Sequence, residues 1–160
     1  MLHVALLEPE IAGNTGQIAR TCLAVGSRLH LIRPLGFRLD AAALRRAGMD
    51  YWGRADVQVH AGYPAFRAAL APLFEQRRVL AFSTRGTPPA CAGLFAAAAD
   101  PGDRLLLFGP ESRGLPDAVL AEATAVRLPM RPGTRSLNLS AAVAAALYLT
   151  WAESGFAGGG

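Results

Sequence analysis

Two stretches decide the fold: LLLFGPESRGLP, residues Leu105–Pro116, and RLPMRPGTRSLNLSAAVAAALY, residues Arg127–Tyr148. Each begins with residues typical of a buried strand, passes through a polar turn or loop, and leads into a helix. The carboxyl ends of parallel strands meet at one edge of a sheet, and ligands bind in the crevice at that edge in open α/β folds. The two polar segments are therefore expected to share a binding crevice.

Strand and helix patterns alternate along the whole chain. Asn14, with Gln17 three residues later, has the spacing of a helix N-cap, and Gly26 has the position of a helix end. The alternation predicts an α/β fold with a mostly parallel sheet flanked by helices. Strands are expected at residues 2–7, 28–32, 57–60, 78–83, 105–108 and 125–128, a turn at residues 84–89, and helices at residues 14–25, 40–46, 64–74, 117–123 and 139–153.

The composition favours one compact domain. The chain has 160 residues, 52% of them hydrophobic, with no apolar run of membrane-spanning length. We expect a single domain over residues 1–154 followed by a flexible glycine-rich tail at 155–160. The N-terminus lacks the pattern of a secretory leader, which favours a cytoplasmic location.

The formal charge of +4 is compatible with a polyanionic partner but does not require one. All 16 cationic residues are arginine, whose guanidinium group binds phosphate bidentately. A GC-rich genome would explain the same bias, so the arginine content by itself assigns no function.

The cysteines and histidines predict no metal site. Cys22 and Cys91 lack the paired spacing of zinc ligands and are expected to be unlinked thiols. His3, His30 and His60 lie on three separate strand-like segments, so we expect packed or surface side chains rather than catalysts.

Three groups of polar residues are candidates for a site. Asn14 and Arg20 lie near the start of the first predicted helix, where backbone N–H groups can bind phosphate, although a simple cap and a solvated charge would also account for them. Glu111 lies on a turn bounded by Gly109-Pro110 and Gly114, and a rigid loop on a parallel sheet favours a functional role. The third group is Ser136, Asn138 and Ser140, which crowd the start of the last helix more densely than capping requires.

The segments EPEIAGNTGQIAR, LLLFGPESRGLP and LPMRPGTRSLNLSAAVAAALY together resemble the three motifs of the SPOUT-class (SpoU/TrmH-like) RNA 2′-O-ribose methyltransferases. The likeness is greatest to the small single-domain group that methylates the wobble nucleotide, C34 or modified U34, of leucine tRNAs. It runs almost continuously from Met1 to about Phe156. One departure is Ala12-Gly13, where relatives carry two prolines.

The resemblance implies a fold with a deep C-terminal trefoil knot, which is an exception to the usual absence of threaded loops. It also implies a homodimer that uses S-adenosylmethionine and no metal to modify tRNA rather than DNA. The implied cofactor-binding residues are Phe82, Gly109, Leu128 and Ser136. The implied catalytic residues are Asn14, Arg20, Glu111, Ser136 and Asn138.

The resemblance also suggests roles for individual residues. Guanidinium groups stay protonated in proteins, so Arg20 is expected to hold a phosphate and stabilise developing alkoxide charge rather than act as a base. Glu111 is expected to order the knot loops and the arginines beside the substrate. Surface arginines such as Arg45, Arg46, Arg131 and Arg135 are expected to bind RNA.

Three alternative functions remain open from the sequence. The chain could methylate another tRNA or rRNA position, or it could be a knotted RNA-binding protein without activity. A nucleotide-dependent oxidoreductase is disfavoured because no G-x-G-x-x-G follows the first strand.

Overall fold

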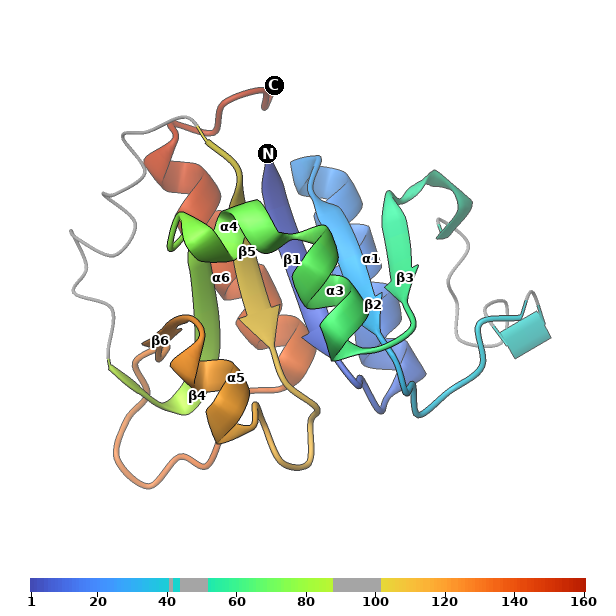
Figure 1. Ribbon diagram of the computed structural model, residues 1–160. Coiled ribbons are helices and arrows are strands. Elements are labelled where there is room, and N and C mark those ends of the chain that lie inside the picture. The colour runs from blue at the N-terminus through green and yellow to red at the C-terminus, as the bar shows by residue number, and fades with distance from the viewer. Residues whose placement is uncertain (41, 44–51, 88–101) are drawn as a thin grey trace.

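The computed structural model describes residues 1–40, 42–43, 52–87 and 102–160. Its centre is a six-stranded parallel sheet in the order β3-β2-β1-β5-β4-β6 (Figure 1). The predicted α/β architecture with a parallel sheet is confirmed. The strands are β1 (Leu2–Leu7), β2 (Arg28–Ile32), β3 (Val57–His60), β4 (Val79–Thr87), β5 (Arg104–Phe108) and β6 (Thr124–Val126).

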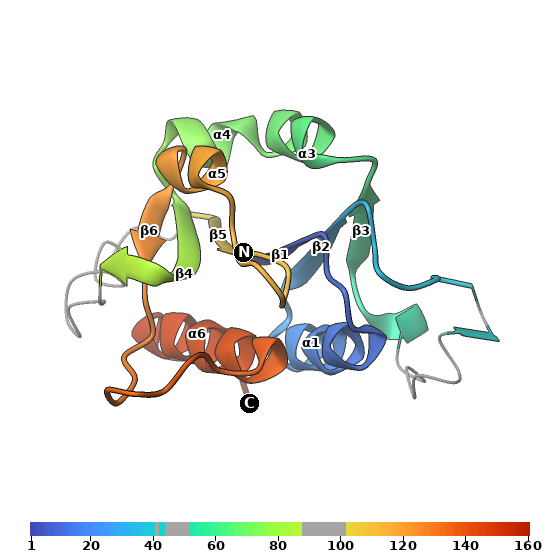
Figure 2. The ribbon, with the colours of Figure 1, turned by 90° about the horizontal axis from the view of Figure 1, so that it is seen from below.

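Helices cover both faces of the sheet (Figure 2). One face carries α1 (Ala12–Val25) and α6 (Leu139–Glu153), and the other carries α3 (Tyr63–Ala69), α4 (Ala71–Glu75) and α5 (Asp117–Ala121). A short 3-10 helix, η1, spans Trp52–Arg54. The central strands are buried on both faces, and all five residues of β5 are buried, as expected for a strand in a covered parallel sheet.

Two apolar cores form because alternate strand residues point to opposite faces. On the first face, Val4 and Leu106 pack with Ile18 of α1 and Leu147 of α6. On the second face, the apolar strand residues pack with Phe66 of α3 and other side chains from α4 and α5. The alanine-rich sequence of α6 leaves little side-chain bulk between that helix and α1.

The order in which strands are added to the sheet changes side between β1 and β5, although all strands remain parallel. β1, β2 and β3 extend to one side of this point, whereas β5, β4 and β6 lie on the other. This is the topological switch point at which open α/β folds form a ligand crevice beyond the strand ends.

Several predicted boundaries were wrong. Ile11, not Asn14, is the N-cap residue of α1, and no side chain caps that helix. The predicted helix at 64–74 is divided at Leu70, because Pro72, in the first turn of α4, has no N–H with which to continue α3. The predicted turn at 84–89 is instead strand through Thr87, with an irregular register opposite Val126.

Other local predictions were confirmed. Gly26 ends α1 in the left-handed conformation, with φ +72°. Asp40 Oδ1 accepts a hydrogen bond from Ala43 N at 2.8 Å, as a cap does, while most of the helix expected after it lies outside the described residues. The flexibility of residues 155–160 stays a prediction, and within this tail Ala157 O accepts a hydrogen bond from Trp151 Nε1 of α6 at 3.1 Å.

Candidate active site

A cavity of about 540 Å³ lies beyond the carboxyl ends of β5 and β6, beside residues 82–85 of β4. This volume falls within the range typical of small-molecule sites. The start of α1 and the loop before α6 also contribute to its wall. Residues from all three polar segments line it: Ile11, Asn14, Phe82–Arg85, Phe108–Leu115, Arg127, Leu128, Met130, Arg135–Leu139 and Ala142.

Glu111 connects the turn after β5 with the start of α1. Its carboxylate accepts hydrogen bonds from Glu10 N at 2.8 Å, Ile11 N at 3.3 Å and Asn14 Nδ2 at 3.1 Å. Glu10 and Ile11 directly precede the first residue of α1, so these bonds fix the segment that leads into the helix. Glu111 therefore connects the turn after β5 with the segment that leads into α1.

Asn14 extends this network to α6. Its side chain is 8% exposed, and Asn14 Oδ1 accepts a hydrogen bond from Asn138 Nδ2 at 3.0 Å. Asn138 Oδ1 in turn caps α6 by accepting from Ser140 N at 2.8 Å. Ser140 Oγ also lies 2.8 Å from Gln17 Oε1. The chain Glu111–Asn14–Asn138 therefore joins all three sequence motifs.

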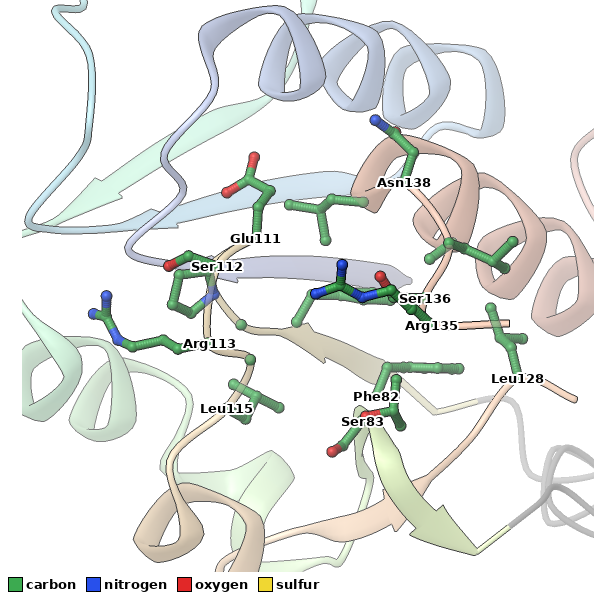
Figure 3. A pocket seen from close by; sticks show the side chains of 18 of the residues that line it. Phe82, Ser83, Glu111, Ser112, Arg113, Leu115, Leu128, Arg135, Ser136 and Asn138 are labelled. Atoms are coloured by element: carbon green, nitrogen blue, oxygen red, sulfur yellow. The ribbon is translucent and has the colours of Figure 1, made fainter. Parts of the chain in front are cut away.

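The opposite side of the cavity is apolar. The rings of Phe82 and Phe108 stack with centroids 4.7 Å apart and planes 9° from parallel. In Figure 3, Phe82 and Leu128 lie on one side of the pocket, and Glu111 and Asn138 lie toward α1 on the other. A molecule bound between them would meet aromatic and aliphatic carbon on one side and amide and carboxylate groups on the other.

Gly109 allows the chain to cross itself closely beside the cavity. A Cβ added to Gly109 would lie 2.3 Å from the carbonyl carbon of Gly114, a distance that no side chain tolerates. Gly114 itself has φ +70°, the left-handed region that glycine adopts without strain. The two glycines are needed for the shape of the turn that Gly114 N closes by donating to Pro110 O.

The structure brings most of the predicted site residues together. The cavity lining includes Asn14, Glu111, Ser136 and Asn138, and the predicted cofactor residues Phe82, Gly109 and Leu128. Arg20 is exposed on α1 and is not among the lining residues. Arg45 and Arg46 lie outside the described residues, whereas Arg131 and Arg135 are exposed.

Some lining and supporting residues were missed by sequence reasoning. Arg85 lines the cavity from the extended part of β4, in the segment predicted as a turn. Glu10 accepts from Ser112 N at 2.8 Å and from Ser112 Oγ at 2.6 Å. The two acidic residues that flank Pro9 at the end of β1 were the available signal for this contact.

The three histidines are packed, as expected, but they form a cluster that the sequence did not reveal. His3 Nδ1 lies 3.0 Å from His30 Nε2, and His30 Nδ1 lies 2.9 Å from His60 Nε2. Burial and the neighbouring His3 and His60 lower the pKa of His30 to about 3. The cluster packs against Phe66 beneath α3, away from the cavity lining.

Cys22 is a free thiol buried in the core, where desolvation raises its pKa to about 11, and Cys91 lies outside the described residues. Within the described ranges, no group of three His, Cys, Asp or Glu side chains could hold a metal ion. No helix in the same part of the chain is long and apolar enough to cross a membrane.

The open parallel sheet and the cavity beside its switch point define an α/β protein with a pocket of the size and place typical of a small-molecule site. The chain belongs to the SpoU rRNA Methylase family, which matches residues 1–148. The resemblance inferred from the three motifs is therefore confirmed.

Individual relatives match over almost the full length. A Burkholderia pseudomallei protein named tRNA (cytidine(34)-2′-O)-methyltransferase is 50% identical, with 99% of each chain covered. A solved structure titled for the 2-OH methylation of C/U34 on tRNA is 45% identical, with a TM-score of 0.84 and 97% of each chain covered. AviRb from Streptomyces viridochromogenes, solved with AdoMet, shares the fold at a TM-score of 0.78 and 21% identity, over 96% of this chain and 60% of its own.

Proposed function

We propose that this protein transfers a methyl group from S-adenosylmethionine to the ribose 2′-oxygen of the wobble nucleotide, C34 or modified U34, of leucine tRNAs. The observation that carries the proposal is the meeting of three distant polar segments in one cavity, joined through Glu111, Asn14 and Asn138. The name of the Burkholderia relative supports the reaction and the nucleotide.

The residues present fit the methyl donor. Phe82 and Leu128 offer apolar surface for an adenine ring, and the turns at Gly109 and Ser136 bring backbone groups close to the cavity. The cavity volume of about 540 Å³ suits a ligand of this size. When bound, S-adenosylmethionine supplies an electrophilic methyl group on a sulfonium centre, and the transfer itself needs no metal.

The acceptor is activated by the polar side of the site. Alignment of the hydroxyl with the methyl group supplies much of the rate enhancement, since both reactants are held in one geometry. Asn14 and Asn138 would orient the acceptor nucleotide, and Ser136, which lines the same cavity, would help to hold the donor. Arg20 lies outside the cavity of its own chain, so it would act at the cavity of a second copy in a dimer, where it would hold the adjacent phosphate and stabilise the developing alkoxide. That phosphate or a water molecule would take the proton, since a guanidinium group stays protonated.

Exposed arginines bind the tRNA. Arg131 and Arg135 lie on the loop before α6, and Arg135 also lines the cavity, so a phosphate chain can pass from this loop into the site. Such contacts are independent of base sequence, so the choice of leucine tRNA depends on additional contacts to the anticodon loop.

The fold is completed by a C-terminal trefoil knot and by dimerisation. The loop before α6 and the turn after β5 line the same cavity, which is the arrangement expected where one passes through the other. Tyr148 and Leu149 of α6 are 45% and 50% exposed and offer an apolar face to a second copy. A homodimer would carry two sites and could bring Arg20 near a cavity. The protein acts in the cytoplasm, where its tRNA substrate is found.

The decisive experiment is incubation of the protein with labelled S-adenosylmethionine and total tRNA, followed by nucleoside mapping of the product. Label in 2′-O-methylated nucleotide 34 of leucine tRNA supports the proposal. Label at another position would assign a different substrate, and donor binding without any transfer would indicate an inactive RNA-binding protein. Arg20→Ala should abolish turnover but retain donor binding, and loss of donor binding with normal turnover per bound donor would refute its role.

A further inference from the structure

Glu10 and Glu111 make a reciprocal contact between two segments that are a hundred residues apart. The Glu111 carboxylate accepts from Glu10 N at 2.8 Å, and the Glu10 carboxylate accepts from Ser112 N at 2.8 Å and Ser112 Oγ at 2.6 Å. Each acidic side chain therefore binds the backbone beside the other. Loss of either one would leave the turn after β5 held from one side only.

The backbone of Glu10 is itself held by the loop after β2. Gly36 N donates to Pro9 O at 2.9 Å, and a Cβ added to Gly36 would lie 2.6 Å from Glu10 O. The loop after β2 therefore holds residues 9 and 10 against the end of the sheet. Because the Glu10 backbone is fixed in this way, its carboxylate can hold Ser112 in a defined position.

Glu10 is anionic in this arrangement. The hydrogen bonds from the Ser112 hydroxyl and amide lower the pKa of Glu10. Arg113 Nη1 lies 3.7 Å from Glu10 Oε1, and Arg113 also pairs with Glu8. Figure 3 shows Arg113 pointing away from Phe82 and Leu128, so this arginine serves the contact rather than the interior of the cavity.

We propose that Glu10 is a positioning residue for methyl transfer, acting through Ser112 to hold the turn Pro110–Gly114 at the distance from α1 that donor and acceptor require. The proposal rests on the proposed function, because the same turn lines the donor cavity and α1 carries Asn14. Glu10 itself is not a lining residue and needs no contact with either substrate.

The test compares Glu10→Ala with Glu10→Gln. Glutamine can accept from Ser112 N and donate to Ser112 Oγ, so it keeps the shape of the contact without the charge. Glu10→Ala is expected to raise the Kd for S-adenosylmethionine about tenfold and to lower kcat at saturating donor, which is the size of effect that one lost hydrogen-bonded contact produces. Glu10→Gln is expected to remain within about threefold of the wild type.

Glu122→Ala is the matched control. Glu122 has a side chain 40% exposed against 34% for Glu10, and it accepts from Arg67 Nε at 2.8 Å, outside the cavity lining. It should leave donor affinity and kcat unchanged. The proposal would be overturned if Glu122→Ala lost as much donor affinity and kcat as Glu10→Ala does. It would also be overturned if Glu10→Gln lost as much of both as Glu10→Ala. A folded Glu10→Ala protein with wild-type Kd and kcat would overturn it as well.

Amide hydrogen exchange at Ser112 gives a readout that needs no substrate. Glu10→Ala should accelerate exchange of the Ser112 N–H, and Glu10→Gln should largely restore protection. If the wild type neither binds donor nor methylates tRNA, the proposed function fails, and this exchange still shows whether Glu10 holds the turn. Unchanged exchange in Glu10→Ala would reject the contact itself.

Discussion

Acidification should destabilise this protein before its carboxylates begin to titrate, because of the buried histidine cluster. His3, His30 and His60 lie on adjacent strands, and His3 Nε2 lies 3.5 Å from Asp103 Oδ2. Both contacts along the cluster are satisfied when the rings are neutral and His30 and His60 each donate from Nε2 to Nδ1 of the preceding histidine. A proton added at His30 Nδ1 would face the His60 Nε2 proton, so the folded state resists protonation.

The magnitude follows from the pKa of His30. Burial, with the neighbouring His3 and His60, lowers this pKa from 6.5 to about 3, and burial is the main cause of the lowered pKa values of His3 and His60. Below pH 6.5 the unfolded chain binds a proton that the folded chain does not, so the free energy of unfolding falls as the pH falls. At pH 5 the loss from His30 alone is about 2 kcal/mol, and it continues to grow down to about pH 3.

Urea unfolding at pH 8, 7, 6 and 5 would measure this effect, since Asp and Glu side chains remain mostly ionised over that range. The free energy of unfolding should fall by at least about 2 kcal/mol between pH 8 and pH 5. His30→Asn should be less stable at pH 8 but should lose about 2 kcal/mol less over the same interval. The reasoning would be refuted if the free energy of unfolding of the wild type stayed constant between pH 8 and pH 5. It would also be refuted if the His30→Asn variant kept the full pH dependence.

Further predictions concern the site. Asn138→Ala should lower the free energy of unfolding by about 2 kcal/mol, from a lost cap and an Asn14 oxygen left without its donor, and the melting temperature by about 4–8 °C. Asn138→Asp keeps the cap and should recover about half of that stability but not activity, and equal stability of the two variants would contradict this. Gly109→Ala should abolish donor binding measured by calorimetry, since the Cβ would displace Gly114, and wild-type affinity would disprove it. The KM for tRNA should rise steeply with salt concentration, whereas a flat response would argue against phosphate contacts.

Element types were largely predictable because they depend on local pattern. The apolar runs at residues 2–7 and 105–108 and the helix Leu139–Glu153 were found where the sequence placed them. Boundaries were less predictable where a distant partner decides them. Asn14 has the spacing of a cap, yet its side chain turns to Glu111 and Asn138, since a buried amide is most stable where both its donor and its acceptor are satisfied.

The sequence predicted which residues belong to the candidate site, but it did not predict which of them contact one another. Glu111 stood out because glycines and prolines bound its turn, and Ser136 and Asn138 because small polar residues crowd a helix start. Two acidic residues flank Pro9, but nothing local identifies Ser112 as the partner of Glu10, and the spacing of the histidines conceals their cluster.

The order of residues alone determined the alternation of strands and helices, the turns that need glycine, and membership of a methylase family. Only the tertiary structure decided which side chains meet, because strand order and register bring together residues separated by a hundred positions. A hydrogen bond depends on angles and on distances of about 3 Å, and neither is encoded in separation along the chain.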